Sequence, residues 1–213
     1  MKLVGMFDSP YVRRVAISMR LLDLPFEHLN WSIGKDQARL AELNPLGQVP
    51  VLVTDDGEPL VESAVILDYL DQLAGPTRAL VPASGDARRR VLGLAALAAG
   101  VADKARLQMY ERVFRPPALQ YEPLRLRLRA QMLATCARLE QACVERAGSP
   151  WLVGDKISQA DVTLGCAVTY AMETVGLPAD EAPLPALRAR HAKLSELPAF
   201  REIYMRFDAP VVA

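Results

Sequence analysis

The residues best placed for chemistry lie in one loop, residues 44–52, in the first quarter of the chain. Gly47 favours a turn, and residues 51–53 form a run of β-branched and aliphatic side chains typical of a short buried strand. Pro50 stands where the turn meets that strand, and an X-Pro bond adopts the cis form at a modest cost of about 0.5–1 kcal/mol. A cis bond would turn the N–H and C=O of Val49 outward, free to pair with an extended peptide-like ligand as an added strand does. The loop therefore predicts a ligand site beside Pro50.

Two helix starts carry further polar residues in the same part of the chain. Ser9 precedes Pro10, which is a strong helix-start signal, because Ser can cap a helix and Pro fits a first turn that needs no N–H. Glu62 and Ser63 open another helix. Ser9 and Ser63 could each be no more than a cap, and Glu62 no more than a first-turn carboxylate. Only their combination with the loop around Val49 favours a functional role.

The elements that position these residues alternate in type. The patterns predict a strand over residues 3–7, a helix over 11–23, a strand over 25–30, a helix over 35–43, strands over 51–53 and 59–61 joined by a hairpin turn at 55–58, and a helix from residue 62. This order is β-α-β-α-β-β-α. We predict one compact α/β domain over residues 1–75.

The second half of the chain shows no convincing strand. Glycine and proline punctuate residues 76–86, which we interpret as a linker. Helices are predicted over 87–114, 124–147, 158–175, 184–193 and 198–207; the alternation over 124–129 also fits a strand, but the residues that follow favour a helix. Ser158 can cap the N–H of Asp161, whose carboxylate can reach back, as in a capping box with Asp in place of Glu or Gln. We predict an all-helical domain over residues 87–213.

Composition excludes several classes of protein. The 213 residues are 51% hydrophobic and hold 25 basic and 25 acidic side chains, so the charge balance does not point to nucleic acid or an anionic membrane. The longest apolar run, residues 91–102, falls short of the roughly 18 residues that span a bilayer, and the N-terminus does not read as a signal peptide. Cys136, Cys143 and Cys166 form no C-x-x-C pair, which favours buried reduced thiols over a metal site. We expect a cytoplasmic protein that binds no metal, no membrane and no nucleic acid.

Taken together, these segments resemble the cytosolic glutathione transferases, which pair a thioredoxin-like N-terminal domain with an all-helical C-terminal one. The matching segments stand in the family's order and at about its spacing over nearly the whole chain: Ser9-Pro10-Tyr11-Val12-Arg13-Arg14, Asn44-Pro45-Leu46-Gly47-Gln48-Val49-Pro50, Glu62-Ser63-Ala64-Val65-Ile66 and Ser158-Gln159-Ala160-Asp161. The resemblance implies an α/β thioredoxin-like domain that binds glutathione and an all-α domain that holds the second substrate.

The resemblance also implies a role for each polar residue near the loop. In the family the Val-Pro bond is cis and the Val backbone pairs with the cysteinyl unit of glutathione, roles that fall to Val49 and Pro50. Glu62 would bind the ammonium of the γ-glutamyl end, and Ser63 with its helix N-terminus would bind the carboxylate. Gln48 would contact the tripeptide backbone near the cysteinyl-glycine end. Lys35 would bind the glycine carboxylate.

Ser9 stands where serine-class transferases activate the thiol and where cysteine-class members have Cys. A free thiol with a pKa of about 8.5 is only a few per cent thiolate at pH 7. A hydroxyl hydrogen bond and a helix N-terminus together stabilise the anion. Ser9 would therefore donate a hydrogen bond to the sulfur and act neither as base nor as nucleophile. Because Ser replaces Cys, conjugation or isomerisation fits better than glutathionyl mixed-disulfide chemistry.

The second substrate is less well defined. An apolar pocket for it could be lined by Tyr11, Met109, Tyr110 and Phe114, although a Met or aromatic residue at helical spacing also fits a core. The resemblance implies a homodimeric enzyme that conjugates glutathione to a small electrophile.

Two alternatives stay open. A glutathione-dependent isomerase is one, although the Ser-Ser-Cys pattern of maleylacetoacetate-type isomerases is absent. A non-catalytic regulator that binds a protein partner such as RNA polymerase is the other, although such regulators generally lose the residues that Gln48, Glu62 and Ser63 match.

Overall fold

The structure is a computed structural model, and it describes residues 1–209. By their contacts the described residues form two compact units, one of Met1–Ala83 with Leu197–Arg206 and one of Ser84–Glu196 with residues 207–209. The predicted helical domain over 87–213 differs from this division, since residues 197–206 group with the first unit; its last residues, 210–213, lie outside the described part.

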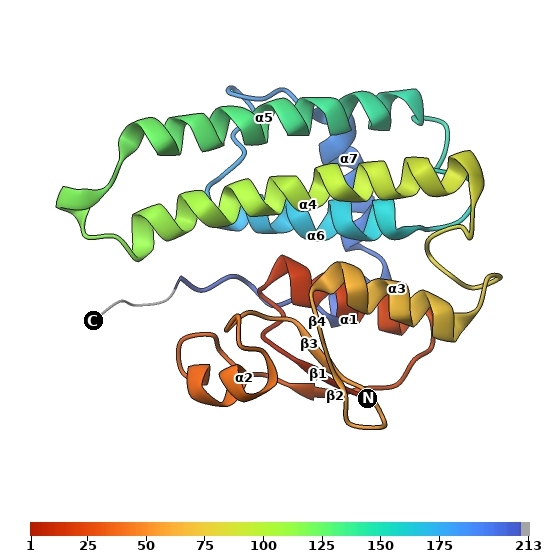
Figure 1. The fold of residues 1–213 in the computed structure, drawn as a ribbon. Helices are drawn as coiled ribbons and strands as arrows, with labels where there is room; N and C mark the ends of the chain where they lie inside the picture. Colours follow the sequence, from red (N-terminus) through yellow and green to blue (C-terminus); the bar gives the residue numbers. More distant parts are fainter. Residues whose placement is uncertain (210–213) are drawn as a thin grey trace. The chain divides into compact units, whose positions relative to one another are not determined.

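The first unit contains a four-stranded sheet in the order β2-β1-β3-β4 (Figure 1). Strand β1 (Lys2–Val4) pairs in parallel with β2 (Glu27–Leu29) and antiparallel with β3 (Val51–Val53), which pairs antiparallel with β4 (Pro59–Val61). Buried residues of β1 and β3 form the core of the sheet together with Leu40. The predicted order of elements is confirmed, and with its helices this unit has the thioredoxin-like fold.

Four helices complete the first unit: α1 (Pro10–Leu21), α2 (Gln37–Leu43), α3 (Ser63–Ala74) and the short α8 (Pro198–Glu202). Helix α1 contacts both α3 and α8. It ends two residues before its predicted limit, because Asp23 adopts a left-handed conformation with φ of 54° that a continuing helix does not allow.

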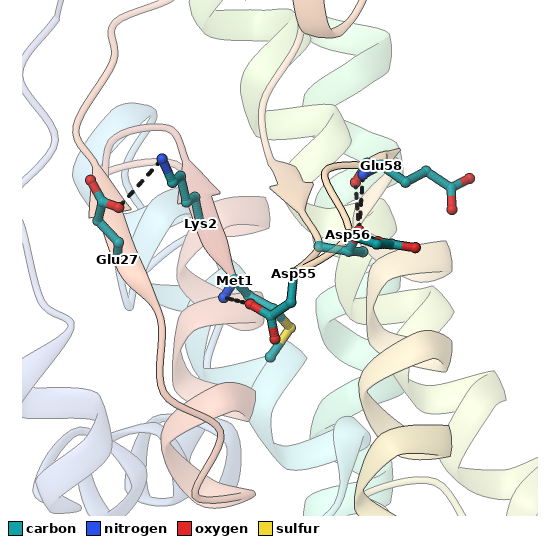
Figure 2. Close-up of polar contacts among 7 residues, drawn as sticks. Met1, Lys2, Glu27, Asp55, Asp56 and Glu58 are labelled. Carbon is teal, nitrogen blue, oxygen red and sulfur yellow. Dashed lines mark hydrogen bonds and ion pairs between the residues drawn. The ribbon is translucent and has the colours of Figure 1, made fainter.

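The turn between β3 and β4 is held by its own side chains (Figure 2). Thr54 Oγ1 accepts the N–H of Glu58 at 3.0 Å and donates to the Asp56 carboxylate, a bond that lowers the pKa of Asp56. The Met1 ammonium forms an ion pair with Asp55 and ties the start of β1 to this turn. The predicted hairpin turn at 55–58 is confirmed. It holds the C-terminal end of β3, whose N-terminal end follows the loop of residues 44–50.

The second unit is all-helical over residues 84–196. Its helices are α4 (Gly85–Val113), α5 (Glu122–Glu145), α6 (Gln159–Thr174) and α7 (Pro185–Ser195), with a 3-10 turn at Pro117–Leu119. Helix α4 lies between α5 and α6 (Figure 1), and α6 is buried along nearly its whole length. Residues 124–129 belong to α5, so the helical interpretation of that alternating segment is confirmed.

The three cysteines lie inside the second unit. Cys136, Cys143 and Cys166 are free thiols and buried, as predicted, and burial raises the pKa of Cys136 to about 11. Residues 1–209 contain no cluster of three or more His, Cys, Asp or Glu suited to a metal ion. Within the same residues, none of the helices combines the length and the apolar character that crossing a membrane requires.

Candidate functional site

The sheet of the first unit brings three segments to one edge. Val4 at the end of β1 is opposite Val51 at the start of β3, and Val51 is opposite Val61 at the end of β4. The chain that leaves Val4 toward Ser9, the chain that enters Val51 from the loop, and the chain that leaves Val61 toward Glu62 therefore all meet the sheet at this edge. The strand register thus gathers three segments that sequence analysis singled out separately.

Asn44, which by its sequence pattern only ends a helix, holds the loop before β3. Asn44 is buried; its side-chain amide donates to the Gln48 carbonyl at 2.8 Å, and its side-chain oxygen accepts the N–H of Leu46 at 3.0 Å. Gly47 has a φ of 62° and donates its N–H to the Asn44 carbonyl at 2.9 Å, which confirms the predicted turn. The Val49–Pro50 bond is cis. Neither the N–H nor the C=O of Val49 bonds to another residue among 1–209.

Gly5 sets the close approach of this loop to α1. A Cβ atom at Gly5 would lie 2.6 Å from Val12 Cγ2 and 2.8 Å from Val49 Cβ, and its φ of 127° is one that L residues rarely adopt. Its carbonyl oxygen lies 2.7 Å from His28 Nε2. This role of Gly5 is not predictable from sequence, since a glycine in an apolar segment carries no signal of what approaches it in space.

Ser9 is the N-cap of α1, with extended backbone angles of −69° and 126°. Its Oγ accepts the N–H of Val12 at 3.4 Å, which is at the limit of a hydrogen bond. In the described chain its hydroxyl donates to no group. The side chain is half-buried, so a donor hydrogen is available at the N-terminus of α1 to a ligand at the sheet edge.

Arg13, one turn further along α1, holds the chain segment that leads to Ser9. Its guanidinium is 2% exposed and donates to the carbonyl of Phe7 at 2.9 Å and to that of Met205 at 2.6 Å. It also lies over the ring of Tyr204, 5.4 Å from the centroid. Arg13 thereby joins the segment before Ser9 to the segment after α8, a link between distant parts of the sequence that local patterns do not reveal.

Glu62 and Ser63 stand at the start of α3. Glu62 has a φ of 67° and a ψ of 120°, an uncommon conformation for a residue with a side chain, which costs about 1–3 kcal/mol. Its carbonyl accepts the N–H of Ile66 at 3.0 Å, while its exposed carboxylate pairs with no residue in the described part of the chain. The Ser63 hydroxyl is likewise unbonded there, although the residue is only 6% exposed. A strained residue beside an unbonded hydroxyl, on a residue that is itself mostly buried, is typical of a ligand site.

The remaining predicted ligand contacts are more exposed. The Gln48 side chain extends from the loop, and Lys35 stands in the turn before α2, where only its backbone N–H is bonded, to Ser32 Oγ at 3.4 Å. Neither side chain has a polar partner within residues 1–209. Their roles toward a ligand stay predictions.

The four residues predicted for a second substrate fall in different units. Tyr11 belongs to α1, whereas Met109 and Tyr110 lie in α4 and Phe114 directly follows it. Met109 is 4% exposed and belongs to the helical core. The rings of Tyr110 and Phe114 pack edge to face with centroids 5.0 Å apart. Within the helical unit these two aromatic residues therefore form one small cluster.

Comparisons with known proteins find similarity to the same family in both units. Residues 3–78 match the family model of the glutathione S-transferase N-terminal domain, and residues 93–196 match that of the C-terminal domain. The chain is 34% identical over 170 residues to the uncharacterized GST-like protein YibF of Escherichia coli K12, covering 80% of this chain and 81% of the relative.

Two solved structures extend the similarity to the fold. A glutathione S-transferase from Methylobacillus flagellatus KT with GSH bound is 28% identical, with a TM-score of 0.86 over 95% of this chain and 98% of that one. A glutathione transferase family member from Pseudomonas fluorescens Pf-5 with bound glutathione is 32% identical, with a TM-score of 0.82 over 95% and 97% of the two chains. The similarity therefore includes both halves of the molecule.

Proposed function

The chain belongs to the glutathione S-transferase family, and on that premise we propose that its first unit binds glutathione and delivers the thiolate to a small electrophile. The observation that carries the proposal is the set of polar groups left unbonded around one edge of the sheet: the Val49 backbone, the Ser9 and Ser63 hydroxyls and the Glu62 carboxylate. Polar groups of residues that are buried or half-buried, as Ser63, Ser9 and Val49 are, are normally bonded, so this edge favours a polar ligand.

The chemistry of glutathione fits these groups one by one. The Val49 N–H and C=O would pair with the cysteinyl unit in the manner of an added strand. The Glu62 carboxylate would bind the γ-glutamyl ammonium, and Ser63 with the N-terminus of α3 would bind the adjacent carboxylate, since a helix N-terminus favours an anion. Gln48 and Lys35 would contact the cysteinyl-glycine end.

Ser9 would then donate its free hydroxyl hydrogen to the sulfur. A bound thiol loses its proton to solvent more readily when that hydrogen bond and the N-terminus of α1 stabilise the anion. The thiolate sulfur donates an electron pair to an electrophilic carbon and forms an S–C bond, while a leaving group departs or a proton from solvent completes an addition. Ser9 takes part by stabilising charge on the sulfur and forms no covalent bond.

The test is a calorimetric titration of glutathione into the wild-type protein and the variant Glu62→Ala. We expect wild-type binding at micromolar to millimolar concentrations and about 10- to 100-fold weaker binding in the variant, because a charge-assisted hydrogen bond is lost. Glu58→Ala is the matched control: it removes an exposed carboxylate of the same unit from the hairpin turn (Figure 2) and should leave the affinity unchanged.

Conjugation is then measured with a panel of small aromatic and unsaturated electrophiles. The proposal is wrong if the wild type binds no glutathione at concentrations of several millimolar. It is also wrong if Glu58→Ala weakens binding as much as Glu62→Ala does. Light scattering in the same preparation tests the homodimer, which stays a prediction.

A further inference from the structure

His28 stands in β2, an edge strand of the sheet, and its side chain reaches the segment that leads to Ser9. Successive side chains of a strand point to opposite faces of the sheet. Leu29 packs against the core of the sheet on one face, so the neighbouring His28 lies on the other face. His28 is half-buried, and the transferase function proposed above gives it no role.

The imidazole of His28 holds the first residue after β1. Its Nε2 atom lies 2.7 Å from the carbonyl oxygen of Gly5. A carbonyl oxygen only accepts hydrogen bonds, so Nε2 carries the hydrogen and His28 is the donor. The Gly5 N–H in turn donates to the carbonyl of Leu29 at 3.0 Å. Residues of β2 therefore bind both polar groups of the Gly5 backbone, which is buried.

The same imidazole stacks on the ring of Phe7. The two ring planes are 4° apart and their centroids are 3.7 Å apart, which is close parallel stacking. The carbonyl of Phe7 accepts a hydrogen bond from Arg13 Nε at 2.9 Å. One side chain of β2 thus contacts the segment of residues 5–9 at two points, four residues and two residues before Ser9.

We propose that His28 is a positioning residue for the Ser9 hydroxyl, a role that rests on the transferase function proposed above. It acts through the Gly5 carbonyl and the Phe7 ring and needs no contact with glutathione. A hydrogen bond weakens steeply as the donor moves out of line, so a fixed backbone before Ser9 keeps the hydroxyl aimed at the thiolate sulfur. Loosening that backbone lowers the effect of Ser9 on the sulfur while the hydroxyl itself is retained.

Three substitutions of His28 test this role. His28→Leu removes the hydrogen bond and the ring, His28→Gln keeps an N–H for the Gly5 carbonyl, and His28→Phe keeps a ring for Phe7. Ultraviolet absorbance of the thiolate against pH, at saturating glutathione, gives the pKa of the bound thiol. In His28→Leu we expect that pKa to rise by about one unit and kcat/KM below it to fall about tenfold. The other two variants should each show a smaller rise, because each keeps one contact.

Leu22→Val is the matched control for a loss of stability. Leu22 is 1% exposed and stands at the C-terminal end of α1, the end away from Ser9. The substitution should lower the temperature of unfolding, because it removes a buried methylene, and leave the thiol pKa unchanged. A rise of the thiol pKa as large as that in His28→Leu would show that the pKa follows general loosening of this unit, and would overturn the proposal.

The double variant Ser9→Ala, His28→Leu tests whether His28 acts through Ser9. Once the hydroxyl is absent, its position no longer matters, so adding His28→Leu to Ser9→Ala should change the thiol pKa by about 0.3 unit or less. A further rise of a full unit would mean that His28 affects the sulfur by another route, and the positioning role would be wrong.

Hydrogen exchange separates failure of this proposal from failure of the transferase function. The Ser9 N–H donates to the carbonyl of Met6 at 3.2 Å, so its exchange rate reports how firmly the segment is held in the absence of any ligand. We expect exchange of this N–H to be at least tenfold faster in His28→Leu and nearly unchanged in Leu22→Val. If the wild type binds no glutathione, the transferase proposal fails, and this measurement still tests His28. An unchanged rate in His28→Leu would overturn the positioning role.

Discussion

Ser9 begins α1 and Ser158 begins α6, both as N-cap residues with extended backbone angles. Ser158 is 5% exposed, and its N–H and hydroxyl donate to the Asp161 carboxylate at 3.1 and 2.9 Å. Asp161 is fully buried and also accepts the N–H of Leu152 at 2.9 Å. Ser9, by contrast, accepts one long contact from Val12 and donates to no group that the structure describes.

The difference originates in the third residue of each helix. Asp161 occupies that position in α6 and reaches back to its cap, whereas Val12 occupies it in α1 and has no polar group to offer. The start of α6 is therefore satisfied within the protein and contributes to stability. At the start of α1 the Ser9 hydroxyl donates to no group among residues 1–209, and its role toward a ligand is the one proposed above. A serine cap indicates a functional site only when its own helix leaves the hydroxyl free.

The largest effect is expected from Asp161→Ala, which removes the acceptor of three hydrogen bonds in the core of the helical unit. We expect the free energy of unfolding to fall by about 3 kcal/mol, since buried donors would be left unbonded. Urea denaturation measures this loss of stability. The glutathione affinity of the folded protein should not change.

Asp155→Ala is the control for that substitution, because Asp155 is an exposed acid in the loop before α6. It should stay within about 0.5 kcal/mol of the wild type. An equal loss in both variants would mean that acidic charge in this region, and not the capping bonds, stabilises the unit.

Ser9→Ala should impair catalysis and leave stability nearly unchanged, whereas Asp161→Ala should lower stability and leave glutathione affinity unchanged. We expect the pKa of the bound glutathione thiol to rise by about two units, worth roughly 2.7 kcal/mol, and kcat/KM below that pKa to fall about 100-fold. Ultraviolet absorbance of the thiolate, measured against pH, follows the ionisation directly. Stability should change little, because the contact with Val12 is already 3.4 Å long. An unchanged thiol pKa would reduce Ser9 to a helix cap.

Local signals predicted most of the first unit. The strands at 51–53 and 59–61 agree with β3 and β4 at both ends, because β-branched residues flank an unmistakable turn around Gly57. The cap and carboxylate at Ser158 and Asp161 were likewise predicted, since both partners lie within one helical turn.

What sequence could not predict depends on residues that are far apart in the chain. Arg13 bonds to Met205, and Gly5 is required by the approach of Val49. The positive φ of Glu62 has no local signal either, since such a conformation is uncommon for Glu and is imposed by the turn from β4 into α3. The side chains of the candidate site and the cis bond between Val49 and Pro50 were predicted from sequence, whereas the backbone conformation of Glu62 and the buried Arg13 came from the structure.

Ser158→Ala and Ser9→Ala compare directly how much each serine cap contributes to stability. We expect it to lower the free energy of unfolding by about 1–2 kcal/mol, against about 0.5 kcal/mol or less for Ser9→Ala. Thermal and urea unfolding of the two variants side by side give the measurement. Equal losses would show that the long contact at Ser9 is as strong as the short bonds at Ser158.

The smallest expected effect is a pH dependence confined to the start of α6. Burial raises the pKa of Asp161 above its usual value, and the hydrogen bonds from Leu152 and Ser158 oppose this without overcoming it. A folded-state pKa above the unfolded one means that folding takes up a proton between the two values. This contribution to stability is complete below the unfolded pKa and is lost as the pH rises through the folded pKa.

Asp161→Asn isolates that contribution, because every other titrating group is shared with the wild type. The free energy of unfolding of the wild type minus that of the variant should increase as the pH is lowered from about 7 to about 4. A difference that decreases instead would mean that the capping bonds outweigh burial and that the ionised carboxylate is the favoured form. Because Val12 cannot titrate, the equivalent position of α1 should give no such slope until a ligand brings its own ionisable thiol to Ser9.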